Sequence, residues 1–63
     1  MSALAELSSV ATALDELLQR VSTITDNLTG AEQEALSSDL LEVERALGTA
    51  VRRLGRLMEA NRG

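Results

Sequence analysis

Apolar residues recur at alternating intervals of three and four along most of this chain. The first series is Leu4, Leu7, Ala11, Leu14, Leu18, Val21, Thr25 and Leu28. The second series is Leu36, Leu40, Val43, Leu47, Ala50, Leu54 and Leu57. This spacing places one apolar stripe along a helix, the a and d positions of a heptad repeat. It predicts two helices, over about residues 3–27 and about residues 30–60.

The break between the two series contains signals for ending one helix and starting another. Asn27 is a residue type that can end a helix in the left-handed conformation. Ser2 can cap the first helix, and Thr29 with Glu32 has the spacing of a capping box for the second. A linker of about residues 28–30 is so short that consecutive helices must run antiparallel.

We therefore expect residues 1–63 to form one all-α domain, an antiparallel two-helix hairpin. Folding the chain at this linker places Leu4 near Leu54 and Leu18 near Leu40. The two apolar stripes then match layer for layer, and this agreement between separate signals supports the fold.

Each expected helix has more apolar residues than one partner helix can cover. Val10, Leu17 and Ile24 occupy g positions of the first helix, and Val51 and Met58 occupy e positions of the second. These rows fall on opposite flanks of an antiparallel pair, so we expect another chain to cover at least one. Each fully buried side chain of this kind contributes about 1.5–3 kcal/mol.

Self-association is the expected consequence, and we favour a dimeric four-helix bundle packed like a coiled coil. Chains of this size gain little stability from one core and compensate with disulfides, metals or oligomerisation. The residues expected at the contact between chains are Val10, Leu14, Leu17, Leu18, Val21, Ile24, Val51 and Met58.

The composition argues against catalysis and against a cofactor. The 63 residues include no Cys, His, Lys, Pro or aromatic residue. A disulfide is therefore excluded, and a zinc site would lack its usual ligands. Serine is the remaining nucleophile, and no His or Lys could act as its base. We expect a protein that is not an enzyme, with no cofactor and no metal.

Charge is distributed unevenly along the chain, whose formal net charge is −4. Residues 1–44 contain nine acidic residues and one Arg, while residues 45–63 contain five Arg and one Glu. The candidate docking residues for a partner are Arg45, Arg52, Arg53 and Arg56, with Gly48 and Gly55 between them. Guanidinium groups bind phosphate and carboxylate through a planar fork.

Both features of this docking region also have a plainer explanation. The arginines could form a solvated face whose charge balances acidic residues of the first helix, such as Glu6. Gly48 and Gly55 could form a groove for a closely packed helix, or they could be tolerated surface glycines.

Three interpretations of function follow. The first is a non-enzymatic oligomerisation or adaptor module that mediates protein–protein interaction through its apolar helix faces. The alternative is a small regulator that binds an anionic partner, either nucleic acid or an acidic protein, through the arginine face of the second helix, formed by Arg45, Arg52, Arg53 and Arg56. Net acidity argues against nucleic acid. The third is a segment of a larger protein.

The sequence also bears on location and origin. The sequence has no apolar run near the 18 residues that would span a bilayer, so we expect no membrane span. It also lacks a basic segment followed by an apolar one, so we expect a cytoplasmic protein. The abundance of Arg, Ala and Leu fits a bacterium with a GC-rich genome.

Overall fold

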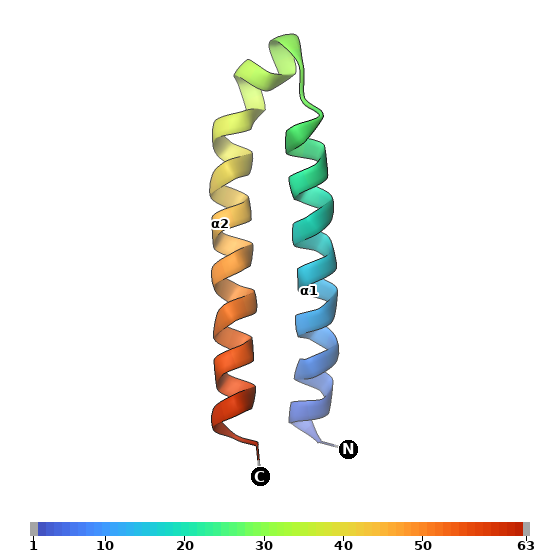
Figure 1. Cartoon of the computed structure of the whole chain (residues 1–63), viewed down its shortest axis with the longest axis vertical. Helices are drawn as coiled ribbons and strands as arrows, with labels where there is room; N and C mark the ends of the chain where they lie inside the picture. The colour runs from blue at the N-terminus through green and yellow to red at the C-terminus, as the bar shows by residue number, and fades with distance from the viewer. Residues whose placement is uncertain (1, 63) are drawn as a thin grey trace.

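The computed structural model of the chain describes residues 2–62 and contains two helices. Helix α1 spans Ala3–Asp26 and helix α2 spans Gly30–Ala60. They run antiparallel and side by side, with both termini at the same end (Figure 1). The all-α hairpin predicted from the heptads is therefore confirmed. Met1 and Gly63, the ends of the expected domain, lie outside the described residues.

Helix α1 begins as its sequence predicts. The hydroxyl oxygen of Ser2 accepts hydrogen bonds from the backbone N–H groups of Leu4 at 3.1 Å and Ala5 at 3.4 Å. These bonds satisfy two of the donors that a helix N-terminus leaves without a partner. The predicted Ser2 cap is therefore confirmed.

The linker between the helices differs from its prediction. Asn27 has a φ of −97°, so the expected left-handed ending is wrong. Within residues 2–62, the positive φ occurs instead at Gly30, at 58°, where α2 begins. The side chain of Thr29 makes no capping hydrogen bond, so the capping box is also wrong. We attribute this to Gly30, because a left-handed first residue turns the backbone away from the geometry in which Thr29 reaches the N–H of Glu32.

The apolar stripe of α1 is confirmed. All eight residues of the first series are half-buried, whereas Val10, Leu17 and Ile24 remain exposed. The e-position residues Asp15 and Ser22 are half-buried as well. Helix α1 therefore turns its a, d and e positions toward α2, and its g positions away.

The stripe of α2 differs from its prediction by one row. Leu36, Val43 and Leu57, expected between the helices, are exposed. Half-buried residues follow instead the series Ser37, Leu40, Glu44, Leu47, Val51, Leu54 and Met58, and Gly48, Thr49 and Ala50 are half-buried beside it. This series has the same spacing of three and four, and it shares its three leucines with the predicted one. The hairpin therefore uses the a and e positions of α2.

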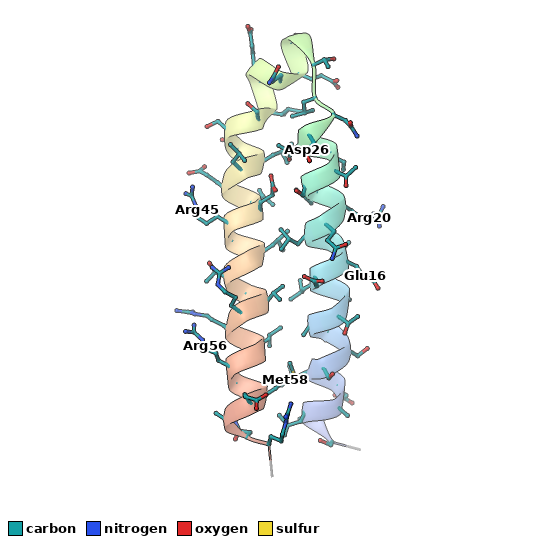
Figure 2. The ribbon with its side chains drawn as sticks, viewed as in Figure 1. Glu16, Arg20, Asp26, Arg45, Arg56 and Met58 are labelled. Carbon is teal, nitrogen blue, oxygen red and sulfur yellow. The ribbon has the colours of Figure 1, made fainter. Side chains whose placement is uncertain are left out.

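The register of the hairpin follows from these half-buried residues. Matched in antiparallel order, the two rows pair Leu4 with Met58, Leu7 with Leu54 and, farther along, Leu14 with Leu47. Met58 points toward α1 near its N-terminal end (Figure 2). We infer a register one helical turn away from the expected pairing of Leu4 with Leu54.

Candidate interaction surfaces

Within residues 2–62, no residue of the hairpin is fully buried. Seven large apolar side chains are exposed by 43% to 55%: Val10, Leu17, Ile24, Leu36, Leu41, Val43 and Leu57. Single exposed apolar residues are normal on protein surfaces, but a contiguous group marks an interaction site. The arrangement of these seven residues therefore shows whether the hairpin has a contiguous apolar surface.

Six of the seven lie on one flank. The g positions of α1 and the d positions of α2, apart from half-buried Ala50, are the rows that the hairpin leaves uncovered. In an antiparallel pair, the g sides of both helices face the same flank, and d lies next to g on each helix. We call this surface the open flank: Val10, Leu17 and Ile24 of α1, with Leu36, Val43 and Leu57 of α2.

The opposite flank is different in character. Val51 and Met58, which we expected at a contact between chains on that side, are half-buried within the hairpin. Gly48 and Gly55 lie there with Leu41, in the b row of α2. One large exposed apolar residue remains on this flank, so the hairpin has one extended apolar surface rather than two.

Sequence reasoning assigned half of the open flank to the wrong place. Leu36, Val43 and Leu57 were predicted to lie between the helices, but they are exposed beside the row of Val10, Leu17 and Ile24. The signal that could have identified the covered row of α2 is its apolar e positions, Val51 and Met58. The assignment of the self-association residues to a contact between chains remains a prediction.

Charge is polarised along the hairpin, which is 50 Å long. The half nearer the turn, residues 15–46, contains eight carboxylates and two arginines, for a net charge of −6. The half nearer the termini, residues 2–14 with 47–62, contains two carboxylates and four arginines, for a net charge of +2. These two values sum to the net charge of the chain.

The arginine face of α2 is exposed and largely without partners inside the hairpin. Arg45 and Arg56 project away from α1, as Figure 2 shows. The ion pair found within residues 2–62 joins Arg62 to Glu59 at 3.0 Å. An ion pair between Glu6 and the arginines, expected if they formed a solvated face, is therefore not formed in this part of the chain.

A shallow surface hollow of about 390 Å³ lies on this face, lined by Arg52, Gly55, Arg56 and Glu59. A Cβ atom added at Gly55 would meet nothing within 4 Å. The hollow is thus an open depression over Gly55, bordered by the side chains of Arg52, Arg56 and Glu59. A second hollow, of about 340 Å³, lies on α1 beside Arg20 and Ile24.

The covered row of α2 contains two polar residues, Ser37 and Glu44. The Oε2 atom of Glu44 is buried and has no hydrogen-bond partner among the described residues. In the inferred register, Glu44 lies opposite Leu18. A buried acceptor without a partner costs about 1–3 kcal/mol, so this position weakens the hairpin.

Residues 2–62 contain neither a metal-binding cluster nor a helix that could cross a membrane. No group of three or more acidic, His or Cys side chains could hold a metal ion. Neither helix has a stretch that is long and apolar enough to cross a membrane.

No family model, curated protein or solved structure matches the chain.

Proposed function

We propose that this protein is a non-enzymatic association module, whose first function is to pair with a second copy through the open flank. The result would be a dimeric four-helix bundle that presents Arg45 and Arg52, both exposed in the hairpin, to other molecules. The observation that carries this proposal is the absence of a fully buried residue within residues 2–62. A fold without a core gains its missing burial from another chain.

The exposed area supports the same proposal quantitatively. The hairpin exposes 4857 Å². A folded monomer of this mass exposes about 3,900 Å² by the general size scaling, so the excess is about 950 Å². Specific protein interfaces cover about 800 Å² on each partner. The excess is therefore of the size that one interface with one other chain would remove.

A single apolar flank favours a closed dimer over a filament. A two-fold dimer uses the same surface on both copies, so one flank is sufficient. A chain with two apolar flanks would offer each copy a second contact, and it could grow into an open assembly. The coverage of Val51 and Met58 within the hairpin removes that second surface.

The test is the mass in solution, measured by light scattering on a sizing column, with circular dichroism on the same fractions. We expect a helical dimer at both low and high salt, because apolar burial persists at high ionic strength. A helical monomer would contradict the proposal. A poorly helical monomer would contradict it too, and would point to a segment that folds on a different protein.

The arginine face supports a second candidate function. Arg52 and Arg56 flank a hollow and form no ion pair within residues 2–62, which favours an anionic partner such as nucleic acid or an acidic protein. Counterion release would make nucleic-acid binding fall steeply with salt. Titration with a short duplex and with an acidic peptide, each at two salt concentrations, tests this candidate. Arg52→Ala should weaken binding if it is correct.

A further inference from the structure

The open flank has an internal symmetry that specifies how a second copy would dock, and this inference rests on the proposed self-association. An interface between two identical chains must be complementary to itself under a two-fold rotation. The question is whether the two hairpins align with their turns at the same end or at opposite ends.

The apolar d row of α2 is nearly symmetric about its midpoint. Its members are Leu36, Val43, Ala50 and Leu57, centred midway between Val43 and Ala50. If α2 faces α2 of the second copy in the antiparallel direction, then Leu36 lies opposite Leu57 and Val43 lies opposite Ala50. Each large side chain at one end of the row meets a large one, and the middle layers pair Val with the smaller Ala.

The charges that border this row reverse their sign about nearly the same centre. Asp39 and Glu42 lie on the side of the turn, and Arg53 and Arg56 lie on the side of the termini. All four side chains are exposed. In the antiparallel alignment, Asp39 lies near Arg56 of the second copy, and Glu42 lies near its Arg53. The two-fold axis repeats both pairs.

The apolar residues of α1 can also pair about a single midpoint, as those of α2 do. The exposed g residues of α1 meet half-buried d residues across the axis, Val10 with Val21, Leu17 with Leu14, and Ile24 with Leu7. These pairs are centred between Leu14 and Leu17. In the hairpin register Leu14 matches Leu47, so this centre lies at the same height as the centre of α2. A single two-fold arrangement can therefore bring α1 against α1 and α2 against α2 of the second copy.

The alternative alignment, with both turns at one end, is less favourable. It would place the two halves of net charge −6 side by side, and likewise the two halves of net charge +2. Screening at physiological salt acts over about 8 Å, so charges across one interface still repel. We propose that two copies dock on the open flank with their turns at opposite ends, α1 against α1 and α2 against α2.

A distance measurement tests this orientation. The chain has no cysteine, so Thr29→Cys places a single spin label in the turn of each copy, on a side chain with no capping bond. At 1.5 Å per residue, turns at opposite ends separate the labels by about 40 Å along the bundle. Turns at one end place them within about 20 Å, because packed helices lie 8–10 Å apart. The shorter distance in a dimer would overturn the orientation alone, whereas a monomer would overturn the proposed function.

A charge exchange gives a second readout. The double variant Arg53→Glu with Arg56→Glu should raise the dissociation constant of the dimer by at least about tenfold, since four contacts change from attraction to repulsion. Adding Asp39→Arg and Glu42→Arg restores the complementary pattern and should restore the affinity. If the quadruple variant stays as weak as the double one, the proposed pairing is overturned.

Discussion

Arg52 folds back along its own helix, where its Nη2 atom donates a hydrogen bond of 3.3 Å to the hydroxyl oxygen of Thr49. A Cβ atom added at Gly48 would meet the Nη1 atom of the same arginine at 3.4 Å. The neighbour is the flexible end of a side chain, so the hairpin itself does not require glycine at position 48 or, since Gly55 has open space, at position 55.

We therefore predict that Gly48→Ala and Gly55→Ala each raise the free energy of unfolding by about 0.5–1 kcal/mol, because alanine is the better helix former. Urea denaturation measures the gain. Gly30→Ala is the contrasting variant and should destabilise the protein, since its φ of 58° disfavours any side chain. If Gly48→Ala or Gly55→Ala destabilises the assembled protein instead, another helix packs closely against that glycine.

Leu17→Glu with Ile24→Glu should abolish the dimer. Each substitution removes an apolar side chain that contributes about 1.5–3 kcal/mol when buried. The dissociation constant of the dimer should therefore rise by about a hundredfold or more. Light scattering measures the mass, and circular dichroism measures the helix content. The matched control is Leu41→Glu, because Leu41 is equally exposed but lies off the open flank. Equal loss of assembly in both variants would mean that the open flank is not the contact.

Glu44→Leu should stabilise the hairpin by about 1–3 kcal/mol, because it replaces a carboxylate oxygen that is buried without a partner. The new leucine also continues the apolar row that includes Leu47 and Val51. Chemical denaturation gives the change in the free energy of unfolding. The same substitution at exposed Glu34 is the control and should change it little. No gain at position 44 would show that Glu44 has a partner in the assembled protein.

The two helix caps should respond differently to mutation. Ser2→Ala removes two hydrogen bonds to the first turn of α1 and should cost about 1 kcal/mol. Thr29→Ala removes no capping bond, so it should lower the free energy of unfolding by at most a few tenths of a kcal/mol. Thermal unfolding of both variants at one protein concentration provides the comparison. An equal loss would mean that Thr29 caps α2 after all.

The fold could be predicted from the sequence because heptad spacing and a short linker together leave few choices. The stripe of α1 was also predictable, since its a and d positions are apolar over its whole length. On α2, however, Leu40, Leu47 and Leu54 belong to two overlapping series. One series continues through Val43 and Leu57, and the other through Val51 and Met58.

Spacing cannot choose between two series that share their leucines. The hairpin covers the series that contains Glu44, which the pattern of apolar residues disfavours, and leaves Leu36, Val43 and Leu57 of the more apolar series exposed. Which row of α2 faces α1 depends on the register of the hairpin. The register depends in turn on the backbone conformation at Gly30 and on which helix faces are covered by other contacts. Both are properties of the folded chain, and the spacing of apolar residues alone does not specify them.

A hairpin in which no described residue is fully buried has a further consequence for the cell. If its burial is completed by a second copy, folding and pairing become one equilibrium, whose position depends on how much protein is made. At low expression the chain would open and be degraded by proteases, and above a threshold it would be protected. Such a chain would respond to its own abundance without binding any ligand.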